Sequence, residues 1–197
     1  MEKYKQLITE IDNILKPFDF KKSNNTFYLN KENNWGIIDF QTSKDSTAFE
    51  KIFTINLGIS STTIREYLED EVKKKPSTWD AHWHMRIGNL LPIKNDYWWK
   101  INTITNVEVL ANEIKNILIE KAVPQLMSII SDDNLIESWL NNNYTGTTEA
   151  AKYKYLLILL KKNNRDELFD FVNELKQTIK NKPYESSIKY LMNDLKL

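Results

Sequence analysis

The sequence His-Trp-His-Met-Arg-Ile at residues 82–87 decides the fold class, because apolar and polar side chains alternate along it. Successive side chains of a β-strand point to opposite faces of the sheet. The apolar members, which we expect to face a core, are Trp83, Met85 and Ile87. The polar members, which we expect to face away from it, are His82, His84 and Arg86. The segment 82–90 therefore predicts a strand in a sheet that is buried on one face.

Three segments upstream carry the same kind of signal. They are short, rich in β-branched and aromatic residues, and separated by Asn, Ser, Asp and Lys clusters at residues 26–29, 36–42 and 52–59. The pair Asn33-Asn34 suits a hairpin turn between the first two. Residues 96–101 form either a fifth strand or an aromatic loop that closes the sheet. Together the segments predict a mainly antiparallel sheet of four or five strands.

Helical periodicity flanks the strands. Apolar residues recur at helical spacing over residues 3–16 until Pro17, and over residues 63–75 until Pro76. From Val107 onward the period is helical throughout. The helices predicted there are 107–122, one that begins at Pro124, 134–140, 148–162, 166–180 and 184–195.

These elements predict an α+β fold in which the N-terminal helix packs on the sheet and an all-helical C-terminal region follows. We expect residues 1–124 to form the α+β domain and residues 125–197 to form a helical region packed on it. The segment 153–160 is apolar on nearly every side of its helix, so it requires burial on several sides. Either the chain's own core or a homodimer through the C-terminal helices would supply that burial.

Composition limits the function. The 27 basic and 27 acidic side chains cancel, so bulk charge gives no attraction to nucleic acid. The chain has no cysteine, which excludes disulfides and thiolate metal sites, and no glycine-rich phosphate loop, so no cofactor is expected. The N-terminus lacks the pattern of a signal peptide, and the longest apolar run, residues 155–160, is too short to cross a bilayer. A cytoplasmic protein that binds no membrane is the simplest interpretation.

The polar residues of the predicted strands form a candidate binding site. If the strands are neighbours, the face away from the core carries Asp39, Gln41, Thr54, Asn56, His82, His84 and Arg86. An antiparallel sheet ordinarily has one solvated face, so these residues could be idle surface. Amides, imidazoles, a carboxylate and an arginine are instead typical of recognition, since lysine and glutamate would dominate an idle face.

Rare side chains concentrate in residues 79–99. This window holds four of the six tryptophans, both histidines and one of the three arginines. Adjacent residues of an extended segment face opposite ways, so we expect one of Trp98 and Trp99 in the core and the other exposed or against a partner. We assign Trp99 and Asp96 to the binding site.

A metal-assisted hydrolase or other small-molecule enzyme is the alternative to a binding protein. His82 and His84 could both reach a metal, with Asp39 as a third ligand, while Arg86 would orient an anionic substrate. A His-x-His pair is more often two hydrogen-bonding imidazoles, so we assign no catalytic residue and no metal ligand. Without a ligand, we expect Arg86 to contact a carboxylate, either Asp39 or Asp96.

Five short motifs follow one another in the chain. They are Leu-Lys-Pro-x-x-Phe-Lys-Lys at 15–22, Asp-Phe-Gln at 39–41, Thr-Ile-Asn-Leu-Gly at 54–58, Arg-Ile-Gly at 86–88 and Asp-x-Trp-Trp at 96–99. In this order the chain resembles the bacterial domain family of unknown function numbered 4304, over roughly residues 4–124. The chain departs from the family at Asp19, where such proteins tend to carry glycine.

The resemblance implies an α+β domain of small bacterial proteins with no assigned activity. It places the characteristic polar positions of the family at Gln41, Asn56, Arg86 and Asp96. The function we expect is a non-enzymatic, protein-binding module, of the adaptor or immunity type, that uses the polar sheet face. The residues assigned to binding are Asp39, Gln41, Asn56, His82, His84, Arg86, Asp96 and Trp99.

Overall fold

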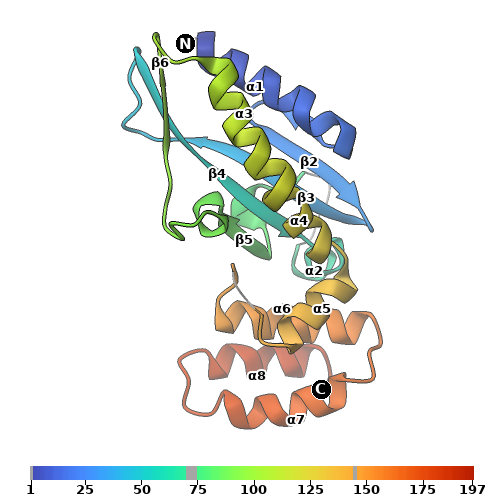
Figure 1. Ribbon diagram of the computed structural model, residues 1–197. Coiled ribbons are helices and arrows are strands. Elements are labelled where there is room, and N and C mark those ends of the chain that lie inside the picture. The colour runs from blue at the N-terminus through green and yellow to red at the C-terminus, as the bar shows by residue number, and fades with distance from the viewer. Residues whose placement is uncertain (1, 70–74, 144–145) are drawn as a thin grey trace.

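The computed structural model describes residues 2–69, 75–143 and 146–197, and it is built around an antiparallel sheet (Figure 1). The strands are β1 (Lys21–Ser23), β2 (Thr26–Lys31), β3 (Asn34–Thr42), β4 (Glu50–Ser60), β5 (Trp83–Arg86) and β6 (Trp99–Asn102). Strands β1 to β5 lie side by side in chain order, and β6 pairs with the opposite end of β4 from β5. The 11-residue strand β4 therefore holds both of the later strands in place.

One face of the sheet is buried under two helices. Helices α1 (Glu2–Leu15) and α3 (Val107–Ile117) lie side by side across this face (Figure 1). Tyr4 of α1 meets Phe53 of β4 edge to face, with ring centroids 5.4 Å apart. The predicted packing of the N-terminal helix on an antiparallel sheet is confirmed.

Strand boundaries differ from the sequence prediction in several places. The strand expected at 82–90 ends at Arg86, because Ile87–Leu90 turn into a 3-10 helix, η3. The turn between β2 and β3 is Glu32-Asn33, one residue earlier than expected, and both residues have the positive φ that a type I′ turn requires. Residues 99–102 form a strand rather than a loop, and the short edge strand β1 precedes all those that the sequence predicts.

Asp19 occupies a turn that suits glycine. The 3-10 turn η1 (Lys16–Phe18) follows α1 and ends at Asp19, whose φ is 64°. Its backbone N–H donates to the carbonyl oxygen of Lys16 at 3.1 Å. The left-handed region favours glycine, and aspartate is among the few other residues that adopt it readily. The substitution therefore keeps the turn.

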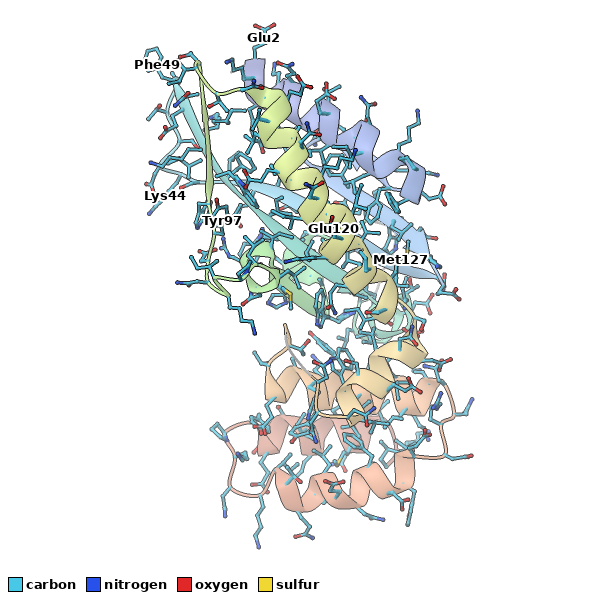
Figure 2. The ribbon with its side chains drawn as sticks, in the orientation of Figure 1. Glu2, Lys44, Phe49, Tyr97, Glu120 and Met127 are labelled. Carbon is cyan, nitrogen blue, oxygen red and sulfur yellow. The ribbon has the colours of Figure 1, made fainter. Side chains whose placement is uncertain are left out.

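A π-helical turn joins α3 to the next helix. Helix α3 continues through η4 (Leu118–Ala122) into α4 (Val123–Ile129), and Figure 2 shows Glu120 and Met127 along this one rod. The sequence predicts two helices that separate before Pro124. Proline lacks the N–H that a helix needs, and the wider π turn before it absorbs that defect without ending the rod.

The remaining helices are α2 (Thr62–Leu68), α5 (Asp132–Leu140), α6 (Glu149–Lys162), α7 (Leu168–Thr178) and α8 (Glu185–Asp194). The expected continuation of α2 to residue 75 falls largely on 70–74, which lie outside the described residues. None of the helices that the structure describes is long and apolar enough to cross a membrane. Helices α5 to α8 gather at one end of the sheet (Figure 1).

Helix α6 lies at the centre of this helical region. It packs against α2, α5, α7 and α8, and its residues from Leu156 to Leu160 are fully buried. The burial that its all-round apolar sequence requires is thus supplied within the chain. Burial of α6 therefore does not require a homodimer through the C-terminal helices, and the homodimer stays a prediction.

The carboxylate of Asp132 joins the sheet to the helical region. Its Oδ1 accepts hydrogen bonds from Asn34 Nδ2 at 2.9 Å and Ser61 Oγ at 2.7 Å, and its Oδ2 accepts one from Thr63 Oγ1 at 2.6 Å. Asn34 begins β3, Ser61 is the N-cap of α2, and Asp132 itself begins α5. One side chain therefore fixes the starts of three elements that are far apart in sequence.

We predict that Asp132→Asn lowers the free energy of unfolding by about 2 kcal/mol, because an amide NH₂ replaces one acceptor oxygen and faces donors. Urea denaturation at neutral pH measures the change. Asp133→Asn is the matched control, because its side chain is 72% exposed and its ion pair with Arg165 contributes little. Equal stabilities of the two variants would contradict the role of Asp132.

Candidate functional site

A pocket of about 410 Å³ lies beside β5 on the polar face of the sheet. Its walls come from β4, the 3-10 turn η2 (Thr78–Asp80), β5, η3 and the loop before α6. The side chains that supply its polar and aromatic groups are Asn56, Thr78, Trp79, His84, Arg86 and Asn89. Asn56, His84 and Arg86 belong to the site expected from sequence, so the structure brings these three together.

A row of polar residues crosses the sheet into this pocket. The register places Asp39 of β3 opposite Asn56 of β4, and Asn56 opposite Arg86 of β5. Asn56 Nδ2 donates to Gln41 Oε1 at 2.8 Å, and Thr26 Oγ1 donates to Asp39 Oδ1 at 2.7 Å. Asp39 and Gln41 therefore stand beside the pocket rather than in its wall. Gln41 acts on the pocket indirectly, by orienting the Asn56 amide.

Arg86 is held by the loop that follows η3. Its Nη1 lies 3.3 Å from Asp96 Oδ1, and its guanidinium lies over the Trp98 ring, 5.1 Å from the ring centroid. The Trp98 indole N–H donates to Asp96 Oδ2 at 2.9 Å. Asp96, rather than Asp39, is thus the carboxylate that Arg86 contacts. Nη1 is buried and makes no hydrogen bond within the described residues, so this ion pair leaves one donor unsatisfied.

Two glycines let backbone segments close around the site. A Cβ atom on Gly88 would lie 1.9 Å from the carbonyl oxygen of Asn95, so only glycine permits the loop to fold back and bring Asp96 to Arg86. Gly146 has a φ of 86°, and a Cβ there would lie 2.4 Å from the carbonyl oxygen of His84. Gly146 in turn accepts a hydrogen bond from the His84 N–H at 2.9 Å, which closes the pocket wall against β5.

Two members of the expected polar face are buried. His82 is 5% exposed because it precedes β5 and packs against Tyr155 of α6, with ring centroids 4.8 Å apart. Its Nδ1 accepts a hydrogen bond from the Ser61 N–H at 3.0 Å. Burial, with the nearby charge of Arg65 as the next cause, lowers the pKa of His82 to about 4. Thr54 is also fully buried. The prediction that His82 lies on the exposed polar face is therefore wrong, because helix α6 covers this side chain.

One of Trp98 and Trp99 is buried and the other is not, as expected, but the buried member is the one that was assigned to the binding site. Trp99 is buried and stacks on Phe53, its partner in the β4–β6 register, at 5.7 Å. Its assignment to the binding face is therefore incorrect, and Trp98 is the half-buried member of the pair. Figure 2 shows Tyr97 on the loop that enters β6, and its ring lies 4.8 Å from that of Trp99, centroid to centroid. Trp79 is 77% exposed at the rim of the pocket.

The structure does not assemble the metal ligands that the alternative interpretation needs. His82 Nδ1 is occupied by the Ser61 N–H, and Asp39 binds Thr26 outside the pocket. Across residues 2–69, 75–143 and 146–197, no three His, Cys, Asp or Glu side chains are grouped as a metal ion requires.

Sequence reasoning missed the pocket residues that lie outside strands. Thr78, Asn89 and Gly146 come from two 3-10 turns and from a loop about sixty residues further along the chain. Strand alternation carries no information about such positions. The concentration of rare residues at 79–99 is the signal that pointed to this region.

Comparison with known proteins identifies one family. The model of a domain of unknown function, DUF4304, matches residues 11–128, which is more than half of the chain. The chain therefore belongs to this family, as its five motifs indicated. No curated protein and no solved structure matches the chain.

We predict that His82 makes the free energy of unfolding decrease as the pH falls below about 6.5. The unfolded chain binds a proton at His82 near the ordinary pKa of 6.5, whereas the folded protein does so only near 4. The contribution of His82 is therefore complete above about pH 6.5 and is lost as the pH falls toward 4, amounting to about 3 kcal/mol. Denaturation of His82→Asn, which keeps an acceptor for Ser61 but does not titrate, should lack this slope. His84→Asn, at an exposed position, should retain it, and parallel curves for all three proteins would contradict the assignment.

We predict that Gly88→Ala destabilises the protein by about 3 kcal/mol, because the new methyl group would overlap the carbonyl oxygen of Asn95 and the loop backbone would have to shift to relieve the overlap. Thermal denaturation measures the loss. Gly36→Ala is the control, since its Cβ would meet side-chain atoms rather than backbone, with Ile130 Cδ1 nearest at 3.3 Å and Leu29 Cβ next at 3.5 Å. A Gly88→Ala protein as stable as Gly36→Ala would disprove the tight loop.

Proposed function

We propose that this member of the DUF4304 family is a non-enzymatic, protein-binding module of the adaptor or immunity type, and that it holds its partner at the pocket beside β5. The observation that carries the proposal is Trp79, a large apolar side chain left 77% exposed at the rim of a pocket. Exposed apolar groups beside a concave polar site are typical of interaction surfaces. Tryptophan and arginine are the residue types that most often anchor protein interfaces.

Two hydrogen bonds hold the turn that carries Trp79. Asp80 Oδ2 accepts hydrogen bonds from the Ser77 N–H at 3.2 Å and from Ser77 Oγ at 2.7 Å, which forms a capping box around η2. A side chain on a fixed turn loses little conformational freedom when it binds. The backbone that presents Trp79 is thus held in place before a partner binds.

The other pocket residues supply directional contacts around this anchor. His84, Arg86 and Asn89 offer hydrogen-bonding groups that would fix the orientation of a partner, while Trp79 supplies contact area. The proposal includes a bacterial and cytoplasmic setting, which the cysteine-free composition suits.

We predict that Trp79→Ala weakens partner binding at least about 30-fold, as loss of an interface anchor does, while stability changes by less than about 0.5 kcal/mol because the side chain is exposed. The partner is first recovered by co-purification from the native host and then produced separately. Calorimetry on the two purified proteins gives the affinity of each variant.

Phe169→Ala is the matched control, because Phe169 is 73% exposed on α7, away from the pocket. It should bind the partner as the unchanged protein does. A partner whose affinity falls equally in both variants, or in neither, would overturn the proposal. A toxin encoded by a neighbouring gene would favour the immunity role, whereas a metabolic operon would count against it.

A further inference from the structure

We propose that the pocket receives an acidic side chain on an extended peptide segment of the partner, with its carboxylate on Arg86 in the position that Asp96 now occupies. This inference rests on the proposed function and names the group that the pocket recognises. It follows from three features of the described residues: a donor without an acceptor, a carboxylate that is 47% exposed, and two asparagine residues of the pocket lining whose Oδ1 atoms accept no hydrogen bond.

Arg86 is prepared for a better acceptor than it has. Its Nη1 is shielded from solvent and makes no hydrogen bond within the described residues, although Asp96 Oδ1 is 3.3 Å away. A shielded donor without an acceptor is costly, and a carboxylate placed in the plane of the guanidinium would satisfy two donors at once. The Trp98 ring, 5.1 Å away, already holds the guanidinium, so the Arg86 side chain loses little conformational freedom when a ligand binds.

Asp96 can leave Arg86 at small cost. Its side chain is 47% exposed, and exposed ion pairs contribute little to stability. Its other oxygen accepts a hydrogen bond from the Trp98 indole, so movement of Asp96 would change the surroundings of that N–H. Asp96 therefore acts as an internal substitute for the ligand carboxylate, and the Trp98 indole N–H reports its position.

The neighbouring amides favour a peptide over a free anion. Asn56 Nδ2 is committed to Gln41, and Asn89 Nδ2 donates to the carbonyl oxygen of Arg86 at 3.3 Å. No hydrogen bond within the described residues reaches Oδ1 of either asparagine, which leaves two acceptors in the pocket wall. A free carboxylate has no N–H to offer them, whereas the peptide groups on either side of an Asp or Glu do.

The charge of the pocket suits one carboxylate. Arg86 is the only arginine or lysine among the described lining residues, so it balances a single negative charge rather than a phosphate chain. The pocket, at about 410 Å³, falls within the range of sites that hold small ligands and side chains. Trp79 at the rim would cover the apolar part of the segment.

The experiment titrates the purified chain with N-acetyl-aspartate N-methylamide and its glutamate analogue, followed by NMR of the Trp79 and Trp98 indole N–H signals and the Arg86 Nε–H signal. We expect saturable shifts of the Trp98 and Arg86 signals with at least one acidic diamide. The neutral asparagine and glutamine diamides should bind at least tenfold more weakly. The absence of a saturable shift, or equal binding of the neutral diamides, overturns the proposal.

Two variants and one further ligand make the test specific. Arg86→Lys, checked for folding by circular dichroism, should bind the acidic diamide at least tenfold more weakly than the unchanged protein does. Asp96→Asn should bind the acidic diamide several-fold more tightly, because the side chain that competes for Arg86 has lost its charge. Unchanged or weaker binding by this variant contradicts the proposal. Succinate should bind more weakly than the acidic diamides, and equal binding would overturn the peptide assignment in favour of a free anion.

The titration uses no partner protein, so it can fail independently of the proposed function. Suppose that the acidic diamide binds, and binds more tightly to Asp96→Asn, but that no partner depends on Trp79. The proposal that Arg86 binds a carboxylate would then be supported, and the proposal of a protein-binding module would be overturned. A partner that depends on Trp79, together with no diamide binding, would support the module and overturn the acidic segment.

Discussion

The carboxylate of Asp132 is the contact on which the position of the candidate site depends. It binds Ser61 Oγ, and the N–H of the same Ser61 donates to His82 Nδ1 at the start of β5. The carbonyl oxygen of His82 accepts a hydrogen bond from Thr147 Oγ1, and the next loop residue upstream, Gly146, binds the His84 N–H. A continuous chain of hydrogen bonds therefore runs from the joint between sheet and helices to the wall of the pocket. Because a partly buried carboxylate is stable only with such donors, the joint and the pocket wall are built together.

Strand alternation predicted the polar row correctly because the side-chain period of a strand is fixed at two. Asp39, Asn56 and Arg86 consequently occupy one face, in register, as the sequence indicates. The same rule cannot say what covers a residue. His82 is buried by helix α6, which begins more than sixty residues later, and the sequence around His82 does not predict that contact. Alternation also predicts that Trp98 and Trp99 separate, but which one enters the core depends on the pairing of Trp99 with Phe53.

The shape of the pocket was beyond sequence reasoning because backbone rather than side chains defines much of it. The chain has only four glycines, and two of them, Gly88 and Gly146, permit backbone segments to approach more closely than any Cβ would allow. Both contacts enclose residues of β5 and of the loop that carries Asp96. A few glycines can therefore mark a site without forming any recognisable nucleotide-binding motif. Because the backbone fixes the walls of the pocket, a small number of side chains determine its specificity.

Unsatisfied buried donors do not by themselves identify that site. Within the described residues, Arg65 Nη1, Trp139 Nε1 and the hydroxyls of Thr54 and Ser60 are also buried without a hydrogen-bond partner. These residues are at most 4% exposed, although Trp139 lines a cavity of about 100 Å³. Arg86 differs because its side chain is 32% exposed and lines the pocket beside β5. A local violation of hydrogen-bond satisfaction points to function only where a ligand has access to correct it, since elsewhere it is a cost that the surrounding core offsets.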